Sequence, residues 1–207
     1  MAADSNGKRG RGRPKAFDRA EVVDTAMTLL WEKGPGALSV NELCESIGVS
    51  KPGLYREFGG DDGLLAAALE RYYAVRIAPL LVKLCQDQPL ADALTMLARW
   101  MATPNTPLPA GCLFAKARTT LQPLGPQASA QIVAMRQTQL ETLTAWMKAA
   151  KRRGDLSHGI SADLAGRYVD TQLTMLLRLV GDGEPPKSIE AQTRLAFAGI
   201  MRQDAGA

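Results

Sequence analysis

Apolar residues along most of the 207-residue chain recur at spacings of three and four, as they do on one face of an amphipathic helix. The first predicted helix spans about residues 19–33, and the next two are short and end before Gly48 and Gly59. A longer helix begins near Asp61 and should kink or divide at Pro79. The other predicted helices lie at about 90–101, 112–121, from the PLGP segment to 154, 161–181 and 187–202. Because no strand-like alternation of useful length occurs, we predict an all-α fold with about nine helices.

Two capping patterns and one tight turn organise the first 60 residues. DRAE at 18–21 and SVNE at 39–42 fit the capping box, in which the cap residue and an acidic residue three positions later satisfy each other's backbone N–H groups. Gly48 permits a tight turn, Ser50 can cap the next helix, and Pro52 lies in its first turn, where a missing N–H costs little. Three short helices with such a turn match helix-turn-helix geometry, although an ordinary helical hairpin would show the same spacing.

The segment FDRAEVVDTAMTLLWEKGPGALSVNELCESIGVSKPGLYREFGGDDGLLAAAL resembles the N-terminal domain of the tetracycline-repressor (TetR/AcrR-like) family. Within it, VSKPGLYREF looks like the family's recognition-helix signature, V-S-x-x-x-L-Y-x-x-F. The resemblance implies a homodimeric, usually repressing transcription factor whose C-terminal domain binds a small-molecule inducer. It divides the chain into a flexible basic arm (1–16), a helix-turn-helix domain (17–60) and a ligand-binding and dimerisation domain (61–207).

The resemblance also implies which residues meet DNA. The hydroxyl groups of Ser39 and Tyr55 would bond phosphates, Lys51 would reach a phosphate or a guanine edge, and Gly53 would let the backbone come close. The set carried over by position is Ser39, Ser50, Lys51, Pro52, Gly53, Tyr55 and Arg56.

Two other positions in this region are predicted to be core residues, and a third differs from the residue that the family often has. Leu54 and Phe58 are expected to pack inside the three-helix unit. Where the family often has a lysine at the start of the fourth helix, this chain has Asp61, whose carboxylate repels phosphate.

Basic residues are concentrated at the start of the chain. Residues 8–15 hold five basic residues and no acidic one, whereas residues 16–60 hold four basic and seven acidic residues, and the whole chain carries a formal net charge of +4. We therefore expect nonspecific attraction to DNA to come largely from the arm. RGRP at 11–14 is similar to an AT-hook core, so Arg11 and Arg13 would enter a narrow A·T-rich minor groove beside each half-site. A general phosphate-binding arm is the open alternative, and we expect residues 1–16 to be disordered when free.

The rest of the chain offers candidates for an inducer pocket among helices four to eight and for a dimer interface on the last two helices. An apolar or aromatic ligand is expected, with Arg118 or Gln139 as its polar anchor; plain core packing is the competing interpretation for each Met and Trp. The pocket candidates are Trp100, Met101, Phe114, Arg118, Met135, Gln139, Trp146 and Met147. In this family the last two helices pair with their symmetry mates in a four-helix bundle, which accounts for a helix at 161–181 that is apolar on two faces. The interface candidates are Val169, Leu173, Leu176, Leu177, Val180, Leu195 and Ile200.

Composition argues against several other classes of protein. Three cysteines without a CxxC or Cys/His cluster indicate neither a disulfide framework nor a zinc site, so no metal or cofactor is expected. No signal peptide or long apolar run is present, which predicts a cytoplasmic protein without a membrane partner. His158 is the single histidine, and no Ser/His/Asp set, phosphate loop or paired-carboxylate signature occurs, so we do not expect an enzyme.

Three alternatives stay open. An architectural protein would bind A·T-rich DNA through the RGRP arm. A thiol-based redox-sensing regulator would use Cys112, because a helix N-terminus lowers a thiol pKa, although a buried packing role competes with this interpretation. A small-molecule-binding protein without a working helix-turn-helix is suggested by the acidic first domain.

Overall fold

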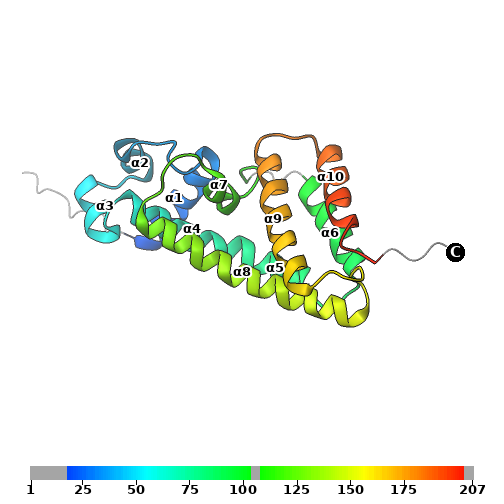
Figure 1. Cartoon of the computed structure of the whole chain (residues 1–207). Helices are drawn as coiled ribbons and strands as arrows, with labels where there is room; N and C mark the ends of the chain where they lie inside the picture. The colour runs from blue at the N-terminus through cyan, green and yellow to red at the C-terminus, as the bar shows by residue number, and fades with distance from the viewer. Residues whose placement is uncertain (1–17, 104–107, 203–207) are drawn as a thin grey trace, which may run out of the picture.

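The computed structural model describes residues 18–103 and 108–202, which form ten α-helices and one π-helical segment (Figure 1). The elements are α1 (Arg19–Lys33), α2 (Val40–Ile47), α3 (Lys51–Phe58), α4 (Asp61–Tyr72), η1 (Tyr73–Ile77), α5 (Ala78–Leu84), α6 (Leu90–Ala102), α7 (Leu113–Thr119), α8 (Pro126–Arg153), α9 (Ala162–Gly181) and α10 (Pro186–Ala198). Extended pairing within the described residues amounts to an isolated bridge between Leu156 and Met201. Because α4, η1 and α5 follow one another without a break, these residues form nine continuous helical bodies, and the predicted all-α fold is confirmed. None of the described helices is long and apolar enough to cross a membrane.

The π-helical segment lies where the sequence predicted a kink. Pro79 lacks an N–H, and its ring crowds the carbonyl of Val75 four residues earlier. The backbone widens immediately before it, so that the N–H of Ala78 bonds the carbonyl of Tyr73. The disturbance caused by Pro79 therefore takes the form of a π-turn, and the helix continues through it.

Helices α1, α2 and α3 pack around a small core that α4 closes. Leu54 is fully buried in this core, together with Trp31 and Leu43. The predicted capping box is present at the start of α2, where the N–H of Glu42 donates to the Ser39 hydroxyl and the N–H of Ser39 donates to the Glu42 carboxylate. Local capping thus sets the limits of this unit, as the sequence predicted.

Helix α8 runs along the molecule beside α4 and packs against α9 (Figure 1). At its N-terminus, the carboxylate of Asp62 in α4 accepts the N–H groups of Gln127, at 2.8 Å, and Ala128, at 3.0 Å. Gly125 is required beside this carboxylate, since a Cβ at that position would lie 2.2 Å from the Asp62 carboxyl carbon. The start of α4, directly after the α1–α3 unit, is therefore held against the start of α8.

Candidate functional site

The turn between α2 and α3 brings α3 to the surface. Gly48 adopts the left-handed conformation (φ 70°, ψ 28°), which costs glycine no steric penalty. The N–H of Val49 then bonds the carbonyl of Cys44 at 2.9 Å. Ser50 caps α3 by accepting the N–H of Gly53 at 3.2 Å. This is the helix-turn-helix arrangement that the spacing of glycine and serine predicted.

One face of α3 is buried and the other is exposed. Leu54 and Phe58 point into the core, as expected. Tyr55 is 50% exposed. Its ring lies against Gly60 (φ 123°), where a Cβ would come within 3.3 Å of the Tyr55 Cε1 atom. The exposed members of the predicted DNA-binding set are Ser39, Ser50, Lys51, Pro52, Tyr55 and Arg56.

Gly53 differs from the rest of that set because it is buried. A Cβ at this position would lie 3.1 Å from the Ser50 hydroxyl oxygen and 3.4 Å from Val49 Cγ1. The space that glycine leaves is taken by the capping side chain. The small size of Gly53 therefore serves the cap, and the expectation that it lets DNA approach the backbone stays a prediction.

Two of the exposed polar groups already bind carboxylates. The Ser39 hydroxyl donates to Glu42 Oε2 at 2.7 Å, and this bond lowers the pKa of Glu42. The Nε of Arg56 lies 2.9 Å from Glu57 Oε1. A serine hydroxyl has one proton to give, so Ser39 can donate to a phosphate only after it releases Glu42. Arg56 has further N–H groups and can keep its pair while it contacts DNA.

The predicted arm residues Arg11 and Arg13 lie outside the described residues. Arg19, at the start of α1, contacts the end of α3. Its guanidinium carbon lies 5.1 Å from the centre of the Phe58 ring.

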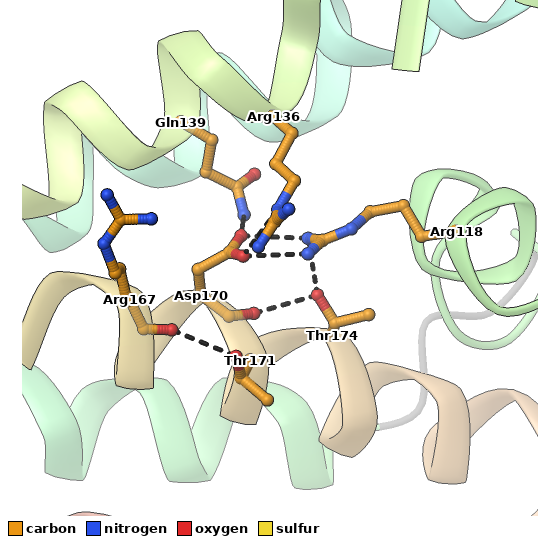
Figure 2. Close-up of polar contacts among 7 residues, drawn as sticks. All are labelled: Arg118, Arg136, Gln139, Arg167, Asp170, Thr171 and Thr174. Carbon is orange, nitrogen blue, oxygen red and sulfur yellow. Dashed lines mark hydrogen bonds and ion pairs between the residues drawn. The ribbon is translucent and has the colours of Figure 1, made fainter. Parts of the chain in front are cut away.

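A buried carboxylate binds the two polar side chains that the sequence assigned to an inducer (Figure 2). Asp170 on α9 is completely buried and receives two bonds from Arg118, at 2.9 and 2.8 Å, and one from Gln139, at 2.8 Å. The Nε of Arg136 lies 3.3 Å away. The Thr174 hydroxyl accepts from Arg118 at 2.6 Å and donates to the Asp170 carbonyl at 2.8 Å. Three helices, α7, α8 and α9, are thus joined through one side chain.

This cluster argues against Arg118 as a ligand anchor, whereas the anchor role of Gln139 stays a prediction. Asp170 already occupies Arg118 bidentately and holds the amide N–H₂ of Gln139. Asp170 and Thr174 were missed by sequence reasoning. The available signal was a lone acidic residue on the apolar stripe that also carries Val169 and Leu173.

A small cavity of about 40 Å³ lies beside the cluster. Its wall comes from η1, α5, α7, α8 and α9 and includes Ile77, Phe114, Gln139 and Thr174. Two of the predicted pocket residues, Phe114 and Gln139, line it. The predicted residues that belong to the hydrophobic core are Met101, Phe114, Met135, Trp146 and Met147, whereas Trp100 is 39% exposed. Within the described part of the chain, the Nε1 atom of Trp146 is buried without a hydrogen-bond partner.

Helix α7 also contacts the helix-turn-helix unit through Trp31 at the end of α1. The indole N–H of Trp31 donates to the carbonyl of Gly111 at 3.3 Å, and Lys116 Nζ donates to the carbonyl of Trp31 at 2.7 Å. Burial lowers the pKa of Lys116 from its ordinary value. The segment that carries Arg118 is therefore attached to both α9 and α1.

Cys112, the candidate redox thiol, caps α7 but lies in the core. Its sulfur accepts the N–H of Ala115 at 3.4 Å. Burial raises the pKa of the thiol and outweighs the lowering from hydrogen bonds with Tyr72 and backbone N–H groups. The pKa is therefore raised and not lowered, because removal from water dominates at this helix start, and this favours the buried packing role over the redox alternative.

The dimer candidates separate into three groups by exposure. Val169, Leu173 and Leu176 are buried within their own chain, as is Ile200, so the assignment of these residues to an interface is corrected. Leu177 and Val180 are partly buried. Leu195 on α10 is 78% exposed, and α9 exposes Leu164 and Met175.

Comparisons with known proteins agree with this geometry. The sequence profile of the family "Bacterial regulatory proteins, tetR family" matches residues 22–68. The HTH-type transcriptional repressor ComR of Escherichia coli (strain K12) is 34% identical over 163 residues, which make up 75% of this chain and 77% of ComR. The HTH-type transcriptional repressor BdcR of the same organism is 34% identical over 83 residues, 40% of this chain and 42% of BdcR. Among solved structures, a cysteine mutant of the TetR family transcriptional regulator CifR, complexed with 26bp double-strand operator DNA, is similar with a TM-score of 0.74 and 23% identity, covering 91% of this chain and 100% of that chain.

Proposed function

The chain belongs to the TetR family and is a DNA-binding transcriptional regulator, and we propose that it is a dimeric repressor released from a pseudo-palindromic operator by a small-molecule inducer. The observation that carries the proposal is α3, whose capped first turn exposes Lys51 and Pro52 while Leu54 and Phe58 anchor it in the core. A helix held in this way presents a rigid face to a major groove. The protein works without catalysis, in the cytoplasm where its operator lies.

Specific contacts are assigned to the exposed face of α3 and its surroundings. Lys51 contacts a phosphate or a guanine edge, and Tyr55 directs its hydroxyl to a phosphate. Arg56 adds a phosphate contact, and Ser39 joins when its hydroxyl releases Glu42. The arm adds attraction through its five basic residues, with Arg11 and Arg13 in the minor groove next to each half-site.

The dimer is assigned to the exposed sides of α9 and α10. Leu164 and Met175 lie on one side of α9, together with the exposed Thr171, because their spacing in the sequence follows the helical repeat. Leu195 is the matching apolar side chain on α10. A two-fold pairing of these helices puts two recognition helices about 34–36 Å apart, or somewhat more, which predicts a pseudo-palindromic site.

Selection of bound sequences from random duplex DNA tests the proposal. A two-fold site of fixed spacing is expected, and Lys51→Ala should weaken binding to it about tenfold, the effect of one good base or phosphate contact. Lys148→Ala, an exposed lysine on α8, is the matched control and should leave affinity unchanged.

The same experiment separates the alternatives. Enrichment of A·T content alone, with binding lost when residues 1–16 are deleted, would instead identify an architectural protein. Equal effects of the two lysine substitutions on operator affinity would contradict the proposal that α3 contacts DNA.

A further inference from the structure

We propose that the cavity beside the Asp170 cluster is an inducer site for a small uncharged aliphatic molecule that donates one hydrogen bond, such as a short alcohol. This inference rests on the proposed function for its regulatory meaning, but the binding itself can be measured without DNA. Three observations support it: the size of the cavity, the apolar character of its wall, and an acceptor atom of the wall residue Gln139 to which no other described residue donates a hydrogen bond.

Size restricts the occupant to a few atoms. The cavity has a volume of about 40 Å³. An apolar cavity of about 150 Å³ accommodates benzene, and one water needs about 10–15 Å³, so the space suits about three non-hydrogen atoms. Ile77 and Phe114 are among the side chains that limit it, and both are buried. A charged ligand is disfavoured because the wall is almost entirely apolar and offers no compensating ion.

Hydrogen bonding restricts the chemistry of the occupant. Two of the polar side chains in the wall are Gln139 and Thr174. Thr174 uses its hydroxyl proton on the Asp170 carbonyl and accepts from Arg118. Gln139 gives its amide N–H₂ to the Asp170 carboxylate, which fixes the orientation of the amide. Gln139 lines the cavity and its Oε1 has no hydrogen-bond partner among the described residues, so this oxygen is the acceptor that the proposal assigns to a ligand with a donor.

The position of the cavity lets the occupant affect the DNA-binding unit. Cys112 and Phe114 at the start of α7 form part of the wall. Gly111, the residue before Cys112, accepts through its carbonyl the indole N–H of Trp31, which lies in the last turn of α1. A molecule that displaces this end of α7 therefore acts directly on a contact to the helix-turn-helix unit.

Methyl NMR of the full chain with isoleucine labelling tests the binding directly. Ethanol should shift the Ile77 methyl resonance and leave that of Ile189, in the core at α10, unchanged. A ligand of three non-hydrogen atoms binds no more tightly than about 0.5 mM, so millimolar titrations are required. Dimethyl ether has the same atoms but no donor and should bind about two- to tenfold more weakly. Equal affinities of the two isomers would overturn the hydrogen-bond assignment, and tighter binding of 1-hexanol at Ile77 would overturn the size limit.

Filling the cavity provides a second test. Leu81→Phe and Leu177→Phe replace wall residues, and either folded variant should lose the ethanol-dependent shift of Ile77. Val82→Phe is the matched control, because Val82 lies on the same helix and is 71% exposed. Retained ethanol binding in a folded, filled variant would overturn the site.

Release of operator DNA by ethanol, measured by anisotropy, then links the site to regulation. Ethanol should weaken operator binding by the parent chain and not by the filled variants. If the chain selects no operator, the proposed function fails while the NMR result on the cavity still stands. If ethanol binds but operator affinity does not change, the cavity is not an inducer site, while the proposal that the chain is a repressor still stands.

Discussion

At the scale of single residues, Asp170 is the most constrained group. A fully buried carboxylate is tolerated only with charged or hydrogen-bonding partners, and here Arg118, Arg136 and Gln139 all point at it (Figure 2). The arginine pair costs desolvation, so its presence does not by itself add stability. Removal of the carboxylate alone, in contrast, leaves the guanidinium of Arg118, whose side chain is 12% exposed, without its charged partner.

We therefore predict that Asp170→Asn destabilises the protein by about 3–5 kcal/mol, since a buried cation loses its partner. Urea unfolding measures the change. Asp182→Asn is the matched control: Asp182 pairs with Arg178 at 2.8 Å, but its side chain is 51% exposed. A surface pair of this kind contributes less than about 1 kcal/mol. Similar losses of unfolding free energy for the two variants would contradict the prediction that the buried carboxylate of Asp170 matters more to stability than an exposed one.

The thiols provide a second prediction at this scale. Burial raises the pKa of Cys112 and raises the pKa of Cys85 to about 12. Thiolate is the reactive form, so about one Cys85 in 10⁴ is reactive at pH 8. Iodoacetamide should therefore modify both residues slowly in the folded chain and rapidly in urea, as mass spectrometry would show. Fast labelling of Cys112 in the folded chain would revive the redox alternative.

Local and distant partners differ in how far the sequence predicts them. Ser39 and Glu42 are three residues apart, and Ser50 lies three residues before Gly53, so the caps follow from spacing alone. Arg118 and Asp170 are 52 residues apart and meet only after α7 packs on α9. Spacing along α7 cannot identify a partner that lies so far away in the sequence.

At the scale of elements, the start of α8 shows how two adjacent aspartates differ. Asp62 caps α8 through two backbone N–H groups, whereas Asp61 is exposed at the start of α4. Asp62→Ala should lower the free energy of unfolding, measured in urea, by about 0.5–2 kcal/mol because the cap is lost.

Asp61→Ala should lower the free energy of unfolding by less and should raise DNA affinity about two- to fivefold at low salt, because it removes a charge that repels phosphate. Unchanged affinity for Asp61→Ala would place α4 away from the DNA.

Helix α9 shows a limit of prediction at the scale of elements: the sequence predicts its two apolar faces but not which of them the chain covers. The sequence identified a helix that is apolar on two faces, and both apolar faces exist. It could not say which face the chain covers itself, because that depends on where α6, α8 and α10 pack. The face with Val169 and Leu173 is internal, and the side with Leu164 and Met175 is exposed. Similarly, proline chemistry predicted a disturbance at Pro79 but not its π-helical form.

At the scale of the whole molecule, the dimer assignment predicts a change in mass. Leu195→Glu puts a charge at the centre of the proposed apolar contact and should shift the protein from dimer to monomer in light scattering after size exclusion. Val82→Glu, at a residue that is 71% exposed on α5, should not change the mass. Monomer formation by both variants, or by neither, would contradict the interface.

In the proposed dimer, we expect the arm to set how DNA affinity responds to salt. Each protomer carries five basic residues between positions 8 and 15. For every DNA phosphate that the protein no longer neutralises, the slope of log affinity against log salt becomes shallower by about 0.9. Deletion of residues 1–16 should therefore flatten this slope by several units while the two-fold operator is still selected.

The conservative pair Arg11→Lys and Arg13→Lys keeps the charge of the arm and so distinguishes the two modes of binding. If the arm meets only phosphates, slope and flanking preference both stay the same. If the arginines lie in the minor groove, the slope is retained but the preference for A·T pairs beside the half-sites falls, because a narrow groove accepts the flat guanidinium better than an ammonium. Binding-site selection with this double variant measures that preference, and we expect it to fall.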